Sequence, residues 1–188
     1  MATLVALLRG INVGLNNRIA MPELRTALAE TGFENVRTYV QSGNIVLDTE
    51  LADAALTEIV ATLIAERFKL DIPVVVRSAA ELAEVVAENP FPAALAAPKL
   101  LQVTFLSSPL PDDVAERVRG ASTGVFSPDT EAISLAISRR NVYGWHPRGI
   151  HASKLARDLS DRKLGVIATA RNWTTVTTLL EMARADVG

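Results

Sequence analysis

The sequence predicts an α+β protein made of two tandem ferredoxin-like (βαββαβ, α/β-plait) units, with a connecting helix and an extra C-terminal helix. Short apolar runs typical of strands alternate with stretches of helical spacing. Their order is strand, helix, strand, strand, helix, strand, and it occurs twice. The expected boundaries are 1–78 for the first unit, 79–98 for a connecting helix and proline-rich linker, and 99–188 for the second unit with the C-terminal helix.

The first unit opens with an apolar run at 3–8, which predicts a buried central strand. Pro22 suits the first turn of the following helix, and Gly32 lies just beyond its expected end. Residues 36–47 alternate between apolar and polar types around a turn at 41–44, and this pattern predicts a hairpin.

The first unit continues with a helix over 52–68 and a strand over 72–76. The helix carries a stripe of apolar residues at helical spacing that is expected to face the core. The stripe consists of Leu56, Ile59, Val60 and Leu63.

The second unit follows a connecting helix at 79–88, which Pro90 is expected to end. A strand at 100–106, a helix at 112–119 and a hairpin over 132–145 come next.

Two polar residues of the second unit suit helix N-caps. Ser153 is expected to cap a helix that ends before Gly165, and a strand at 166–170 follows. Asn172 is expected to cap the C-terminal helix, whose apolar stripe includes Trp173.

Strand direction places the loops of each unit. In the βαββαβ arrangement the first and second strands run parallel, so the loop 9–18 is expected beside the turn 41–44. By the same reasoning, the end of the third strand of the second unit, 145–151, is expected beside 171–173. Two clusters of polar residues are therefore expected. The first joins the early loop, 9–18, to the turn 41–44, and the second, which we call the late cluster, joins 145–151, with the helix start that follows, to 171–173.

Several motifs in order resemble one bacterial family. LLRGINVG, YVQSGNIV, NPF, SKL and ATARNWTTVTTL stand along the whole chain and resemble domain-of-unknown-function family 1697. The resemblance implies two α/β-plait units and carries no established activity. The residues that match its motifs are Arg9, Asn12, Gly14, Gln41, Ser42, Gly43, Asn44, Ser153, Lys154, Leu155, Arg171, Asn172 and Trp173. The chain departs from the family pattern at Leu15 and Asn16, where a glycine and a basic residue are usual, and at His151 and Ala152, where Gly-Arg is usual.

Composition excludes several classes of protein. The chain of 188 residues has no cysteine, so disulfides, thiolate nucleophiles and cysteine-bound metals are excluded. It has no apolar run of the ~20 residues that a membrane span needs, and no secretory signal, so we expect no membrane partner and a cytoplasmic location. The net charge of −2 argues against a nucleic-acid binder that works by overall basicity.

Charge is distributed unevenly along the chain. Residues 48–98 carry nine acidic and three basic side chains, whereas 139–171 carry eight basic and two acidic ones, which marks the late cluster as electrostatically special. Lys154 and Arg157 stand in an expected first helical turn, where positive charge opposes the helix dipole unless an anion binds there. Three interpretations stay open: an anion site, ordinary solvated and core side chains, or attraction that docks the two units.

The early loop has an anion-binding interpretation as well. Gly10 and Gly14 allow a concavity of backbone N–H groups, with Arg9 and Arg18 adding charge. Turn formation alone explains every residue of the loop, however, and this simpler interpretation is favoured.

No catalytic constellation stands out, so whether the protein is an enzyme is left open. The two histidines fit no metal-ligand pattern, and neither a metal nor another cofactor is expected. The leading hypothesis is a protein that binds an anionic small molecule, a nucleotide or short RNA through the basic cluster at two helix N-termini. The alternatives are an enzyme acting on a phosphorylated or carboxylated metabolite between the units, and a structural or oligomerising protein. The candidate ligand-binding residues are Arg9, Asn12, Gln41, Ser42, Asn44, Ser153, Lys154, Arg171, Asn172 and Trp173.

Overall fold

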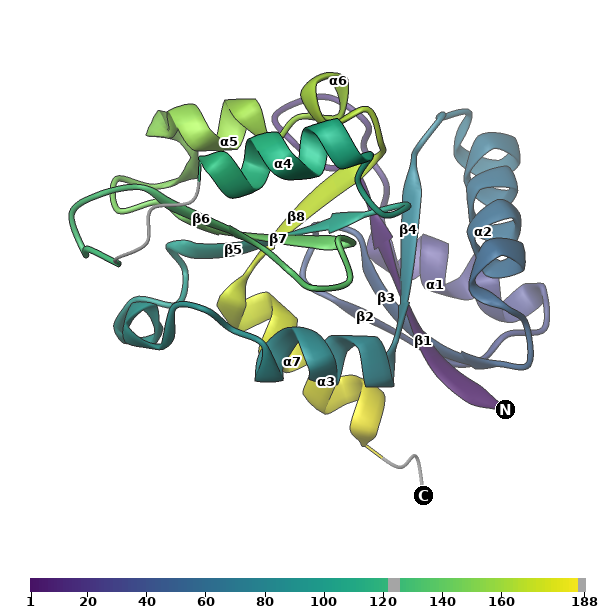
Figure 1. Cartoon of the computed structure of the whole chain (residues 1–188). Helices are drawn as coiled ribbons and strands as arrows, with labels where there is room; N and C mark the ends of the chain where they lie inside the picture. The colour runs from purple at the N-terminus through teal and green to yellow at the C-terminus, as the bar shows by residue number, and fades with distance from the viewer. Residues whose placement is uncertain (122–125, 186–188) are drawn as a thin grey trace. The chain divides into compact units, whose positions relative to one another are not determined.

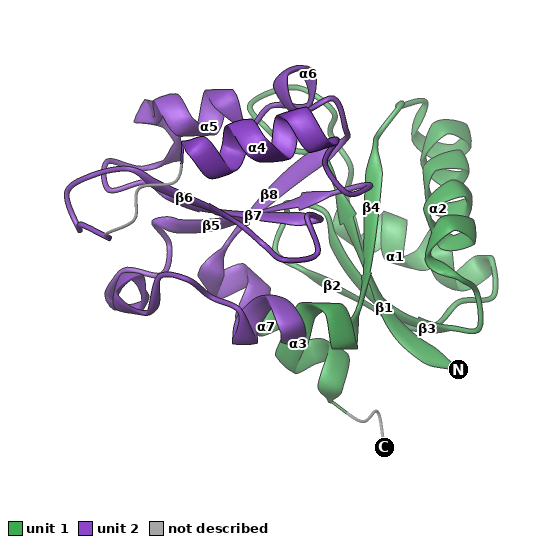
Figure 2. Cartoon of the chain, viewed as in Figure 1, with its two compact units in different colours: residues 1–83, 178–188 green, residues 84–177 purple. Residues whose placement is uncertain are grey.

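The computed structural model describes residues 1–121 and 126–185 and has an α+β fold, which confirms the predicted class. It has two four-stranded antiparallel sheets, with strand orders β2-β3-β1-β4 and β6-β7-β5-β8 (Figure 1). Seven α-helices lie within the described residues. The chain divides into two compact units, Met1–Ala83 with Thr178–Gly188, and Glu84–Thr177 (Figure 2).

The first unit is organised around β1, whose residues Leu4 to Leu8 are all buried. This strand pairs antiparallel with β3 on one side and β4 on the other. The elements are β1 (Ala2–Leu8), α1 (Met21–Glu30), β2 (Glu34–Tyr39), β3 (Asn44–Thr49), α2 (Asp53–Phe68) and β4 (Val74–Ser78).

The set of buried residues along α2 differs from the predicted apolar stripe. Leu56, Val60 and Ile64 are fully buried and join the core of the first unit, whereas Ile59 is 38% exposed. Residues four apart lie on one face of a helix, so a stripe at 56, 60 and 64 turns Ile59 away from the sheet. The predicted assignment of Ile59 to the core was therefore wrong.

The second unit repeats the order of strands and helices on β5. This strand pairs antiparallel with β7 and β8. The elements from the connecting helix onward are α3 (Ala79–Ala87), β5 (Leu101–Leu106), α4 (Asp112–Gly120), β6 (Ala132–Leu135), β7 (Asn141–Trp145), α5 (Lys154–Asp158), α6 (Asp161–Leu164), β8 (Ala168–Asn172) and α7 (Trp173–Arg184). Both unit boundaries thus fall inside a helix, α3 or α7.

The helix predicted from Ser153 to Gly165 is two short helices, α5 and α6. Ser160 has extended backbone angles, φ −79° and ψ 152°, and it interrupts the helical path. The Asp161 carboxylate accepts the backbone N–H of Ala168 at 3.0 Å, which ties the start of α6 to β8. Gly165 ends α6 with φ +73°, as expected of a C-terminal glycine.

The last strand of each sheet carries a buried arginine. Arg77 in β4 lies opposite Val5 of β1, and Arg171 in β8 lies opposite Val103 of β5. The two arginines are 1% and 7% exposed. The same kind of residue therefore stands beside the central strand in both sheets.

The residue after each arginine caps the next helix. Ser78 Oγ accepts the N–H of Glu81 at 3.1 Å, and the Glu81 carboxylate accepts the Ser78 N–H at 2.9 Å, which is a capping box. Asn172 Oδ1 accepts the N–H of Thr175 at 2.9 Å, so the predicted cap of the C-terminal helix is confirmed. Within the described ranges, each helix is too short or too polar to cross a membrane.

The turn between β2 and β3 requires glycine at position 43. Gly43 has φ +76°, and a Cβ on it would lie 2.6 Å from Leu8 Cβ and 2.9 Å from Ile11 Cδ1. Its carbonyl accepts the Leu8 N–H at 2.8 Å, which holds the turn against the end of β1. This close approach brings the two loops of the first unit together.

Replacing Gly43 with alanine should destabilise the protein more than the same change at Gly14. Gly14 has φ +58° with nothing within 4 Å of its added Cβ, so Gly14→Ala should cost only the ~1 to 2 kcal/mol of left-handed backbone. Gly43→Ala adds the overlap with Leu8 and should cost about 1 to 3 kcal/mol more. Urea unfolding of the two variants measures this difference, and equal midpoints would contradict the close packing.

Candidate functional site

The early loop is held by the side chain of Asn12. Its Nδ2 donates to Ile19 O at 2.9 Å and to Gln41 O at 2.8 Å, and its Oδ1 accepts the Ile19 N–H at 3.0 Å. The amide thus closes the loop 9–18 on itself and joins it to the β2–β3 turn. The predicted proximity of these two segments is confirmed.

The loop backbone takes positive φ at two asparagines, Asn12 at +53° and Asn17 at +48°. Asn17 Nδ2 donates to Gly10 O at 3.0 Å, and the Asn12 N–H donates to Asn17 O at 3.0 Å. Asparagine tolerates this backbone region better than most residues because its short side chain hydrogen-bonds locally. These bonds fix the base of a small hairpin.

The β2–β3 turn uses Asn44 in the same way. Asn44 is fully buried, and its Nδ2 donates to Tyr39 O at 3.1 Å and to Ser42 Oγ at 3.0 Å. Gln41 and Ser42 have exposed side chains. Asn12 and Asn44 thus bind the chain itself, and Arg9, Gln41 and Ser42 remain on the surface.

The late cluster is divided between the two faces of the second sheet. Ala168 of β8 belongs to the core beside α4, and successive residues of a strand point to opposite faces. Arg171, three positions on, therefore points to the face away from α4. Ser153 and Lys154 begin α5, which lies on the α4 side (Figure 1). The structure does not bring Lys154 and Arg171 to one site.

Arg171 and Trp173 are buried. Arg171 Nη1 donates to Thr169 Oγ1 and to Ala170 O, both at 2.8 Å, and burial lowers the pKa of Arg171 to about 10. Trp173 is 6% exposed, and its backbone N–H donates to Pro98 O at 3.2 Å. These residues hold the sheet and the start of α7.

Ser153 is the centre of a buried polar network. Its Oγ accepts the N–H of Ala156 at 2.9 Å, which confirms the predicted cap, and lies 2.7 Å from His146 Nδ1. The hydroxyl also hydrogen-bonds the carboxylate of Glu131, which accepts the Leu155 N–H at 3.2 Å. Burial raises the pKa of Glu131, but these hydrogen bonds and the nearby His146 and Arg148 together leave the pKa below its ordinary value.

One proton arrangement satisfies the whole network. The Ser153 hydroxyl donates a hydrogen bond to Glu131. Its two lone pairs accept hydrogen bonds from the Ala156 N–H and from His146 in the tautomer that carries its proton on Nδ1. With that tautomer, the histidine nitrogen facing Ser153 carries a proton and cannot act as a base toward the serine hydroxyl.

Glu131 also changes the electrostatics at the start of α5. Lys154 and Arg157 were expected to oppose the helix dipole unless an anion bound there. For Arg157 this was wrong, because α5 ends at Asp158 and places Arg157 in its last turn, where positive charge is favourable. The Glu131 carboxylate lies at that helix start and supplies negative charge from the chain itself. An external anion is therefore not needed to explain Lys154.

A groove missed by the sequence analysis lies beside this network, and we call it the α4–α6 groove. It has a volume of about 540 Å³ and is lined by residues of α4, β6, α5 and α6. Apolar lining comes from Val118, Ala121, Ile133, Leu155, Leu159 and Leu164, and charged lining from Arg117, Asp158, Arg162 and Lys163. A smaller hollow of about 190 Å³ shares four of these residues and adds Glu131 and Lys154.

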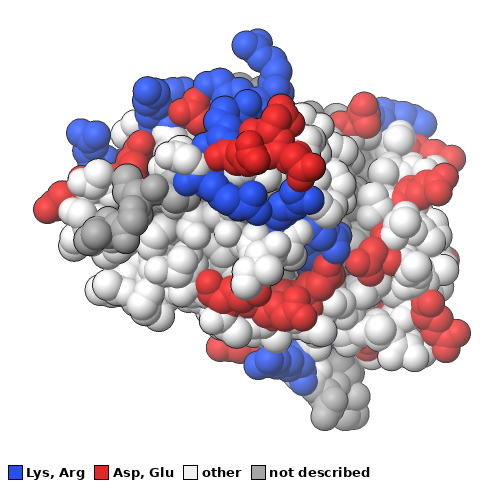
Figure 3. Space-filling view, viewed as in Figure 1, with Lys and Arg blue, Asp and Glu red and all other residues white. Residues whose placement is uncertain are grey.

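The charged side chains of the groove form a rim with excess positive charge. Lys163 pairs with Asp158, and the Arg117 guanidinium donates to Lys163 O. The side chain of Arg162 is exposed and, considering the described residues only, makes no hydrogen bond or ion pair. Lys and Arg gather with interspersed acidic side chains over this part of the second unit (Figure 3).

No metal site is built by the part of the chain that the structure describes, since no three His, Asp or Glu side chains group closely enough to hold an ion.

Lowering the pH should destabilise the fold through His146. Burial lowers the pKa of His146 below its ordinary 6.5, and the nearby Glu131 carboxylate opposes this only in part. As the pH falls below 6.5, the unfolded chain therefore gains a proton that the folded imidazole does not, so the unfolding free energy decreases until the folded form is protonated too.

Urea unfolding of wild type, His146→Asn and His151→Asn from neutral pH down to about 5 measures this slope, above the range where carboxylates titrate. His146→Asn keeps a donor near the Nδ1 position and should flatten the slope. His151 is exposed, so His151→Asn should leave it unchanged. A slope that persists in His146→Asn would contradict the assignment.

Comparison with known proteins identifies a family but no activity. The sequence pattern described as "Protein of unknown function (DUF1697)" matches residues 1–138. A solved structure titled as the conserved bacterial protein SP0830 from Streptococcus pneumoniae is similar, with 20% identity and a TM-score of 0.70. The match covers 97% of this chain and 99% of that one, and at this identity it shows the fold alone. No curated protein matches the chain.

The family match extends from β1 through β6 and includes the early loop, the β2–β3 turn and the linker. The sequence motifs in those segments predicted this family, and the prediction is confirmed. The chain belongs to the DUF1697 family of proteins of unknown function.

Proposed function

We propose that this protein binds an anionic ligand in the α4–α6 groove of the second unit. The observation that carries the proposal is an apolar floor beneath a rim with excess positive charge. Ligand pockets are mostly apolar clefts of about 300 to 1,000 Å³ with a few polar groups that fix orientation, and the volume of about 540 Å³ falls in that range.

The charges of the groove favour an anion. Arg117, Arg162 and Lys163 line it against Asp158 alone, and the adjoining hollow adds one cation and one anion, so the excess stays at two positive charges. Arg162 has no partner among the described residues, so its guanidinium is available for a bidentate contact with phosphate or carboxylate.

The apolar floor favours a ligand with a nonpolar body. Leu155, Leu159 and Leu164 line the groove together with its charged side chains. A nucleotide supplies both parts, a planar base for the floor and phosphates for the rim. This favours a nucleotide over inorganic phosphate, and over an RNA segment held only by its backbone.

We also propose that each of the two sheets forms a ferredoxin-like unit with the helices packed on it, and that residues 79–98 join the two units. The support is the strand order, which is the same in both sheets when each is numbered from its own first strand. In the first unit, residues of α1 and α2 share one core with one face of the sheet, as this arrangement requires.

Removing Arg162 should weaken nucleotide binding. A hydrogen bond to a charged group contributes about 1.5 to 3 kcal/mol, so Arg162→Ala should raise the Kd for ATP at least about tenfold. Isothermal titration calorimetry with ATP, pyrophosphate and a short RNA measures this, and the affinities should fall as salt is raised.

The control for this titration is Arg25→Ala, which removes an exposed arginine of α1 in the first unit and should leave the Kd unchanged. Weaker binding of pyrophosphate than of ATP would support a role for the apolar floor. The proposal fails if none of the three probes binds saturably, or if Arg162→Ala binds as tightly as wild type.

A further inference from the structure

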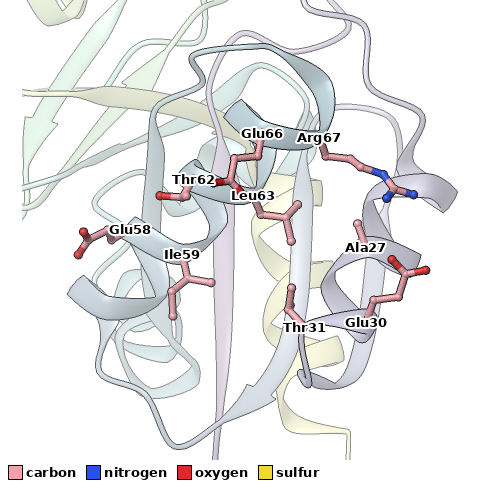
Figure 4. A pocket seen from close by; sticks show the side chains of 9 residues that line it. All are labelled: Ala27, Glu30, Thr31, Glu58, Ile59, Thr62, Leu63, Glu66 and Arg67. Carbon is pink, nitrogen blue, oxygen red and sulfur yellow. The ribbon is translucent and has the colours of Figure 1, made fainter.

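The two helices of the first unit enclose a second groove on the outer side of α1 and α2, which we call the α1–α2 groove (Figure 4). Its volume is about 500 Å³. Ile59 and Leu63 project into it from α2, with Ala27 of α1 opposite. The apolar residue that the helix pattern assigned wrongly to the core, Ile59, is therefore exposed within a groove.

The rim of the α1–α2 groove is acidic. It is lined by Glu30, Glu58 and Glu66. In the described chain, none of these three carboxylates forms an ion pair or a hydrogen bond. The one lining cation, Arg67, lies 3.7 Å from Glu23 outside the groove. Like charges around one apolar depression repel each other, and a cationic apolar group placed there would relieve this repulsion.

The early loop of the same unit projects exposed apolar side chains and an exposed cation. Residues 13–16 form the tip of the small hairpin, closed by the Asn16 N–H donating to Val13 O at 3.2 Å. Leu15 is 89% exposed and Val13 is 64% exposed, and Leu15 is the most exposed of the large apolar side chains described. Arg18 follows the tip, is exposed, and has no ion pair among the residues described.

The tip is also rigid before it meets a partner. The hydrogen bonds of Asn12 and Asn17 fix its base, and Asn12 joins it to the β2–β3 turn. A preorganised loop loses little conformational entropy on binding, which favours its use as a contact surface. Exposed leucine at such a tip is otherwise unfavourable in water.

We propose that the hairpin tip of one copy of this chain inserts into the α1–α2 groove of a second copy. Leu15 and Val13 contact Ile59 and Leu63, and Arg18 faces the glutamates of the rim. Tip and groove are different surfaces of one unit, so a two-fold dimer makes the contact twice. This pairing rests on the first unit alone and is independent of ligand binding in the second.

Charge complementarity favours a second copy as the occupant of the groove. The tip offers apolar side chains to the apolar lining of the groove and a cation to its acidic rim, and both belong to residues of this chain. The tip of residues 13–16 supplies far fewer than the roughly 20 to 30 residues on each side of a standard interface, so the two-fold repetition is needed for stable association.

Sedimentation velocity over a series of protein concentrations tests the pairing. Wild type should associate reversibly as the concentration rises. Leu15→Asp, which places an anion on the tip, and the double variant Glu58→Lys, Glu66→Lys, which reverses the groove, should each raise the dissociation constant at least tenfold.

A mixture of the tip variant and the groove variant gives the decisive measurement. Leu15→Asp keeps an intact groove and the double variant keeps an intact tip, so the mixture should associate more tightly than either alone. The matched controls are Ile137→Asp, at an 87% exposed apolar residue of the second unit, and Glu34→Lys, at an exposed glutamate outside the groove. Both should associate as wild type does.

Circular dichroism of each variant checks that it is folded. A wild type that stays monomeric at every concentration overturns the proposal. So does association that neither the tip variant nor the groove variant weakens, since another surface would then be responsible.

Discussion

The burial of the central strand on both faces is the constraint on which the rest of each unit depends. Leu4 to Leu8 of β1 are all at most 3% exposed, so neither face of the first sheet near its centre is available to solvent. Polar groups that act on a ligand or partner must then come from strand ends, loops and outer helix surfaces. Both grooves and the hairpin tip lie at such places. The arginines at matching positions of β4 and β8 show the same constraint, because a guanidinium among buried strands must donate to nearby backbone, as Arg77 Nη1 does to Val76 O at 2.7 Å.

Sequence reasoning worked where the determining contacts are local or follow from strand direction. Ser153 and Asn172 were predicted as caps because a cap binds a backbone N–H within three residues. The meeting of the early loop with the β2–β3 turn followed from parallel strands, and Asn12 makes that contact. The motifs of the family were equally local, and the family was identified from them.

Prediction from the sequence failed where packing between segments distant in the chain determines the structure. Glu131 reaches the start of α5 from 24 residues away, and no local pattern marks it as the negative charge at that helix. Ser160 interrupts a helix that its neighbours favour, because Asp161 is tied to β8. The α4–α6 groove exists only once α4, α5 and α6 are placed around β6. Strand alternation places Arg171 on the face opposite Ala168, but only the structure shows that Ala168 faces the core beside α4 and that Lys154 lies on that side.

The position of the C-terminal helix bears on the order in which the protein is made. The first unit includes residues from Thr178 onward, and Arg37 Nη1 donates to Met182 O at 2.8 Å across 145 positions of the chain. A ribosome makes the strands and helices of this unit first, but the unit gains its last segment only after the second unit has been made. The first unit therefore stays incomplete while the second unit is being made, and a chain that ends before Thr178 lacks part of its first unit.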